Sequence, residues 1–110
     1  MTHIVPLSDY RHKRRRVYFD RIELGRLLSL YSDRVIRGEW RDYAIDHSIG
    51  MALFSVFRHT HDRPLFSIAK CADPNGLTYA VFDSKGRIRR ATTLNEALAY
   101  VPPRPMLVSD

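Results

Sequence analysis

Apolar residues between Asp20 and Gly38 follow the period of an α-helix. They recur every three or four positions, at Leu24, Leu27, Leu28, Tyr31 and Val35. Three more apolar residues widen this stripe: Ile22, Leu30 and Ile36. Asp20 with Glu23 three residues later is a capping-box pattern, and Gly38 is a typical residue just after a helix end. The pattern predicts a helix over 21–37 with one core-facing side.

After Gly38 the period falls to two, which is typical of β-strands. Five strand-like segments follow, at 43–48, 51–58, 65–71, 77–83 and 87–93. Turn signals separate the last three, at Asp73-Pro74-Asn75-Gly76 and Ser84-Lys85-Gly86. Segment 51–58 is apolar at both alternating sets of positions, which indicates a central strand covered on each face. Short loops between strands predict an antiparallel meander.

A second helix is predicted at the C-terminal end of the domain. Thr93-Leu94-Asn95-Glu96 forms another capping-box pattern, and the helix should run over 94–101 and stop before Pro102. The predicted fold is therefore α+β: an antiparallel five-stranded meander with one long N-terminal helix packed on it and a short C-terminal helix. Residues 17–19 form a short β-prone element before the long helix. We expect a flexible basic arm at 1–16, a single domain at 17–101 and an extended tail at 102–110.

The charge of the chain is concentrated in the N-terminal arm. The 110 residues carry a net charge of +6, of which residues 1–16 contribute +4. The basic residues of the arm are Arg11, Lys13, Arg14, Arg15 and Arg16. No apolar run has the length of a membrane span, and the order of charges at the N-terminus does not fit a secretory signal. We expect a cytoplasmic protein with no membrane partner, and its one cysteine, Cys71, excludes an internal disulfide.

Three segments, in this order, resemble an uncharacterised alphaproteobacterial family known only as a domain of unknown function. They are FDRIEL at 19–24, GEWRDYAIDH at 38–47 and FSVFR at 54–58. The resemblance covers roughly residues 17–101, and the second segment is its most distinctive part. It implies a compact, single, bacterial and cytoplasmic domain without a known cofactor. It implies no catalytic role for any residue.

The segment GEWRDYAIDH supplies the candidate binding residues, which are Trp40, Arg41, Asp42, Tyr43 and His47. In one interpretation Trp40 fills the junction between helix and sheet, and Arg41 pairs locally with Asp42 or a helix carbonyl. In the other, Arg41, Tyr43 and His47 form a polar pocket that holds an anionic group and exchanges a proton. On a strand Asp46 and His47 point to opposite faces, so these two side chains cannot act on one another.

Two further clusters could carry binding. His59 and His61, two residues apart beside Asp62, are weak candidates for metal ligands, but nothing else in the chain completes a site, so we predict no metal. The basic run at 11–16 could bind a nucleic-acid backbone, and Arg87 and Arg89 on the last strand could extend it, with Arg90 on the other face. A solvated basic tail explains the same run equally well.

No catalytic or phosphate-binding sequence motif occurs in the chain, so we expect no cofactor. The leading hypothesis is a small non-catalytic binding or regulatory module, whose partner could be a protein docking at the 38–47 segment or at the sheet edges. The first alternative is nucleic-acid association through residues 11–16 and the Arg87–Arg90 strand. The second is a small enzyme with a polar pocket around Arg41, Tyr43 and His47.

Overall fold

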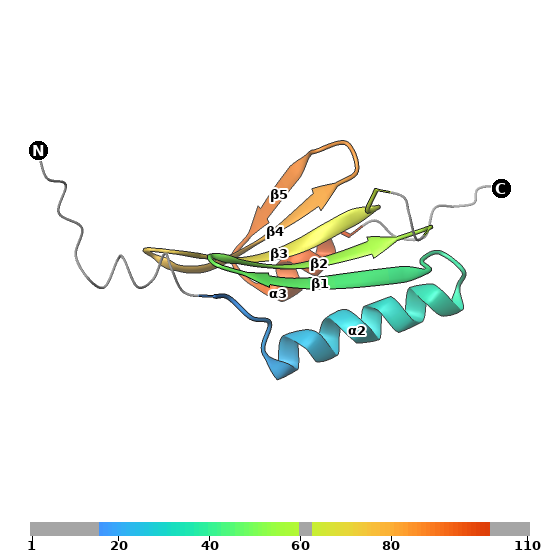
Figure 1. The fold of residues 1–110 in the computed structure, drawn as a ribbon, viewed down its shortest axis with the longest axis horizontal. Helices are drawn as coiled ribbons and strands as arrows, with labels where there is room; N and C mark the ends of the chain where they lie inside the picture. Colours follow the sequence, from blue (N-terminus) through green and yellow to red (C-terminus); the bar gives the residue numbers. More distant parts are fainter. Residues whose placement is uncertain (1–15, 60–62, 102–110) are drawn as a thin grey trace, which may run out of the picture.

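The computed structural model describes residues 16–59 and 63–101. The elements are α2 (Arg21–Ile36), β1 (Asp42–Ser48), β2 (Met51–Phe57), β3 (Phe66–Asp73), β4 (Gly76–Asp83), β5 (Ile88–Ala91) and α3 (Leu94–Ala99). The five strands form one antiparallel sheet in the order β1-β2-β3-β4-β5, with α2 running alongside β1 (Figure 1). The predicted α+β meander with a long and a short helix is confirmed.

Helix α2 begins where the capping pattern predicts. The Asp20 side chain accepts a hydrogen bond from the Glu23 N–H, and the Glu23 carboxylate accepts one from the Asp20 N–H, both at 2.8 Å. Gly38 follows the helix with a φ of 78°, a conformation that glycine adopts without steric cost. The predicted widening of the apolar face is wrong at two positions, because Ile22 and Ile36 are 66% and 85% exposed. They lie outside the arc that contacts the sheet.

Helix α3 is shorter than predicted and is capped differently. Thr93 accepts a hydrogen bond from the Glu96 N–H at 3.1 Å, as an N-cap should. The Glu96 carboxylate, however, returns to the N–H and hydroxyl of Thr92 rather than to the N–H of Thr93. Tyr100 then ends the helix, two residues before Pro102. The hydrogen bond that Glu96 accepts in a capping box is therefore made with Thr92, one residue before the N-cap Thr93.

Residues 17–19 form an extended segment with little strand pairing. Arg16 makes an isolated bridge with Ile49, and the Val17 N–H donates to the Ser48 carbonyl at 2.9 Å. The side chains of Val17 and Phe19 are buried in the core. The segment therefore runs from beside the β1–β2 hairpin to the start of α2, with its buried side chains in the core.

Both helices lie against the same face of the sheet. One core cluster contains Leu27 of α2, Leu94 and Ala97 of α3, and alternate residues of the strands such as Phe54 and Ile68. We call this the helix face. The opposite set of alternating side chains, which we call the open face, belongs to no part of that cluster. Within the described residues neither helix covers the open face, where Leu53 and Phe57 of β2 are half-buried. None of the described helices is long and apolar enough to cross a membrane.

Candidate functional site

A buried network of ionisable side chains joins the start of α2 to the middle of the sheet. The Lys70 ammonium donates to Glu23 Oε1 at 2.7 Å and to the Tyr18 carbonyl at 2.8 Å. The Tyr79 hydroxyl donates to the other Glu23 oxygen, Oε2. Lys70 and Tyr79 are directly opposite one another on β3 and β4, and both face the helices. The network therefore fixes where the N-terminal segment and α2 sit on the sheet.

The geometry of the network keeps Glu23 charged. Burial raises the pKa of the Glu23 carboxyl, but the hydrogen bonds from Lys70, Tyr79 and the Asp20 N–H outweigh burial and lower the pKa below its ordinary value of 4.5. Burial and the bond to Glu23 raise the pKa of the Tyr79 hydroxyl well above its ordinary value of 10.0. Tyr79 therefore stays protonated and acts as a hydrogen-bond donor, not as a base.

We expect the stability of the domain to depend on the charge of Glu23 in acid. Because the folded-state pKa is lowered, this stabilisation is complete above the ordinary value of 4.5 and is lost as the pH falls through the folded-state pKa. Urea denaturation between pH 6 and pH 3 should therefore show a steeper loss of stability in the wild type than in Glu23→Gln. Equal slopes would contradict the assignment. Asp83 and Glu96, whose pKa values are also lowered, contribute equally to both proteins.

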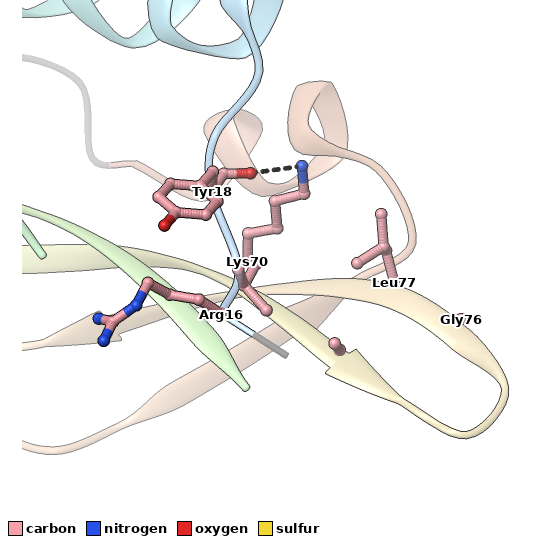
Figure 2. Close-up of a pocket in the computed structure, with 7 residues that line it drawn as sticks. Arg16, Tyr18, Lys70, Gly76 and Leu77 are labelled. Carbon is pink, nitrogen blue, oxygen red and sulfur yellow. Dashed lines mark hydrogen bonds between the residues drawn. The ribbon is translucent and has the colours of Figure 1, made fainter. Parts of the chain in front are cut away.

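A pocket of about 320 Å³ lies next to this network, between the N-terminal segment and the β3–β4 hairpin. Its lining residues come from both segments: Arg16, Val17, Tyr18, Lys70, Ala72, Gly76 and Leu77. In the view of Figure 2 the Lys70 side chain has Tyr18 on one side and Leu77 on the other, and its ammonium group meets the Tyr18 carbonyl. The walls are mostly apolar, and Lys70 and Arg16 are the charged members of the lining.

The polar groups of the pocket favour a bound molecule that accepts hydrogen bonds. An ammonium group has three N–H donors, and among the described residues Lys70 uses two of them, on Glu23 and on the Tyr18 carbonyl. Arg16 donates from one terminal nitrogen to the His47 carbonyl at 2.6 Å. Among the described residues, the lining contains two cationic side chains and no acidic one. Its chemistry thus suits a small molecule with an apolar body and an anionic group.

Trp40, the first of the predicted binding residues, is a packing residue. Its side chain is only 4% exposed and fills the junction between the end of α2 and the sheet. The ring lies 5.2 Å from Phe66 and 6.2 Å from Tyr31, measured between ring centres, and the Arg34 guanidinium lies 5.5 Å from its centre. A buried ring enclosed in this way cannot contact a ligand directly.

The other candidates of the 38–47 segment are separated along β1. Tyr43 packs edge-on against Tyr31 at 4.7 Å and stacks on Phe54 at 5.4 Å. His47 shares the face of Tyr43, as predicted, but lies about 13 Å further along the strand. Arg41 precedes the strand and is exposed, with its backbone N–H on the Phe57 carbonyl. Tyr43 and His47 thus sit in different surroundings.

His47 and Asp42 each have local partners of their own. The His47 ring packs against Tyr18 at 4.8 Å and Phe19 at 6.1 Å, and its buried Nε2 has no hydrogen-bond partner among the described residues. The Asp42 carboxylate accepts a hydrogen bond from the Tyr43 N–H at 2.8 Å. Alternation places Asp42 on the open face, away from His47.

Arg87 and Arg89 of the predicted arginine group line one pocket of about 460 Å³ on the helix face, together with Asp83 and Tyr100. Arg87 precedes β5 and pairs with Asp83 at 2.6 Å, while Arg89 lies 5.3 Å from the centre of the Tyr100 ring. Arg90 projects from the opposite face of the sheet, as predicted. Of the basic arm only Arg16 is described, because Arg11, Lys13, Arg14 and Arg15 lie outside the described residues. Nucleic-acid binding by the arm stays a prediction.

The histidine pair is only partly described. His59 is exposed, and His61 lies outside the described residues. Within residues 16–59 and 63–101, no group of three or more side chains is placed to hold a metal ion.

Sequence reasoning missed the residues of the buried network and the pocket. One signal was present: Lys70 lies in register with the buried apolar positions Phe66 and Ile68 of β3. A lysine in that phase of a strand needs a buried partner, because an unpaired buried charge is costly. The partner could not be identified from the sequence, since Glu23 lies 47 residues from Lys70 in the chain.

Comparison with known proteins identifies the family and nothing more specific. A family described as "Protein of unknown function (DUF2794)" matches residues 17–98, so the chain belongs to that family. No curated protein matches the chain. No solved structure matches it either. The resemblance seen in the three sequence segments, to a family without an assigned activity, is confirmed.

Proposed function

We propose that this DUF2794 domain is a non-catalytic binding module that holds a small amphipathic anion in the pocket beside Lys70. The observation that carries the proposal is the lining of the pocket by the described residues. They supply apolar side chains from Val17, Ala72 and Leu77, the cations Lys70 and Arg16, and no acid. The volume of about 320 Å³ lies within the range of small-molecule sites. The module would act in the cytoplasm.

The buried network supports binding rather than chemistry at this site. The Lys70 ammonium donates to the Glu23 carboxylate, and burial together with the hydrogen bond to the same carboxylate raises the pKa of the Tyr79 hydroxyl. Tyr79 is therefore not poised to act as a base at neutral pH. What the network supplies is a fixed ammonium donor, since Lys70 cannot swing away without leaving Glu23 unpaired.

Octanoate is a suitable probe because it combines an eight-carbon apolar chain with a carboxylate. We expect saturable binding by isothermal titration calorimetry with a Kd on the order of 1 mM, as the number of non-hydrogen atoms in the probe allows. Octylamine, which carries the opposite charge on the same chain, should not bind. Equal binding of the two probes, or no binding of octanoate, would overturn the proposal.

A pair of matched variants locates the binding. Leu77 is 50% exposed and forms a wall of the pocket, so Leu77→Asp both removes apolar surface and repels a carboxylate. We expect octanoate binding to weaken by at least about tenfold. Ile36 is an exposed aliphatic residue on α2, outside the pocket lining, and Ile36→Asp should bind octanoate as the wild type does. Unchanged binding by Leu77→Asp would place the ligand elsewhere.

A further inference from the structure

The open face of the sheet carries more apolar surface than a polar, solvated face would. Its large side chains are Met51, Leu53, Phe57, Phe82 and Ile88, all exposed or half-buried. Between them lie small side chains, among them Ser55 and Ser67, whose hydroxyls bond each other at 2.8 Å. An antiparallel sheet with one solvated face normally alternates apolar and polar residues strictly. This face does not, which indicates that something covers it.

One row of side chains across the open face has opposite charges at its two ends. The register of the sheet places five residues side by side: Asp46, Leu53, Ala69, Ala80 and Arg90. Asp46 at the β1 end and Arg90 at the β5 end are both exposed. Ala69, on the middle strand β3, lies at the centre of the row. Small residues at the centre allow the close approach of a second flat surface.

We infer that the open face docks against the open face of a second copy of this chain. A two-fold axis that runs parallel to β3, between the two sheets and over Ala69, exchanges the two ends of the row. Asp46 of each copy then faces Arg90 of the partner subunit, so the pairing is made twice. Packed sheets are about 10 Å apart, a gap that a short aspartate and a long arginine bridge together at the rim.

The interface is apolar at its centre and charged at its two rims. Around the axis lie the small residues Ser67, Ala69 and Ala80, with Leu53 and Phe82 beside them. A partner with an anionic surface would be attracted by Arg90 but repelled by Asp42 and Asp46 on the same face. A second copy satisfies both signs of charge at once, which is why we favour it over a different protein.

The test is a charge swap followed by sedimentation equilibrium at low salt, where ion pairs are least screened. The wild type should form a dimer. Asp46→Arg and Arg90→Asp should each weaken the dimer by at least about tenfold, because each variant places like charges opposite one another twice. The double variant Asp46→Arg/Arg90→Asp should dimerise as the wild type does, since both pairs are restored with reversed sign.

Mixing provides a second readout on the same proteins. When Asp46→Arg and Arg90→Asp are combined, a heterodimer with two opposite-charge pairs becomes possible, and we expect it to form more tightly than either homodimer. Asp33→Arg on α2 is the matched control: Asp33 is exposed and outside the open face, so this variant should leave the dimer unchanged. Folding of each variant is checked by circular dichroism.

Three results would overturn the inference. The first is a wild-type protein that stays monomeric up to about 100 μM, because the Kd of the dimer would then lie above that concentration. The second is a dimer that neither single charge change weakens. The third is a dimer that is weakened by the single changes but not restored by the swap or by mixing, because that pattern would show the charges to act without facing one another. Ligand binding beside Lys70 is on the helix face and is unaffected by any of these outcomes.

Discussion

Replacing Phe54 with alanine should lower the free energy of unfolding by about 3–5 kcal/mol. Phe54 is fully buried at the centre of the helix face and is one of the largest side chains in that state. It pairs across the sheet with Ile45 and Ile68 and stacks on Tyr43. No neighbour can move into the space without leaving its own contacts, so the substitution leaves a cavity as well as removing apolar surface.

Urea denaturation of Phe54→Ala can be followed through the fluorescence of Trp40, the single tryptophan, which is buried in the same core. Since domains of this size are stable by about 5–15 kcal/mol, a loss of this size consumes a large part of the total. Ile36→Ala, at an exposed position, should change stability by less than about 0.5 kcal/mol. A loss below about 1 kcal/mol for Phe54→Ala would show that the core around it is not packed as described.

The helices and the strand order could be predicted from the sequence because their signals are local. The capping pair Asp20 and Glu23 starts α2 at the expected place, and the glycine at 38 ends it. The short turns at Asp73–Gly76 and 84–86 bring β3, β4 and β5 together as antiparallel hairpins. Each of these signals lies within a few residues of the structure that it determines.

The helix face and the open face could not be told apart from the sequence. Strand β2 has Ala52, Phe54 and Val56 on the helix face and Met51, Leu53 and Phe57 on the open face, so both sets of positions are largely apolar. Such a pattern indicates that both faces of the strand are covered. It does not say whether the cover of the second face comes from the same chain. Among the described residues, both α2 and α3 pack on the helix face. The remaining apolar set is the surface that we assign to a second copy.

The candidate site was harder to predict than the fold, because its residues are far apart in the chain. The 38–47 segment was predicted as a binding site because aromatic and charged residues are concentrated in it. Its Trp40, however, is a buried packing residue. Lys70 instead was a single charged residue in an apolar strand, and its partner Glu23 carried a capping signal that already explained it. Glu23 both caps α2 and pairs with Lys70, and only the capping role is visible in the sequence.

The buried pair of Glu23 and Lys70 should show strong coupling in a double-mutant cycle. Lys70→Met alone leaves the Glu23 carboxylate buried without its counter-charge, and we expect a loss of about 3–5 kcal/mol in the free energy of unfolding. Glu23→Gln alone leaves the Lys70 ammonium buried without its counter-charge and should also lower the free energy of unfolding. The Lys70 and Glu23 side chains are 8% and 11% exposed, respectively, so solvent cannot compensate for the missing charge.

The double variant Glu23→Gln/Lys70→Met removes both charges and keeps an amide oxygen to accept from the Asp20 N–H. It should therefore be more stable than Lys70→Met by about 2 kcal/mol, because neither remaining group is a buried charge. Urea denaturation of the four proteins at pH 7 gives the coupling energy. Additive losses, with the double variant the least stable of the four, would mean that Lys70 and Glu23 act separately, and the fixed ammonium donor proposed for the pocket would lose its physical basis.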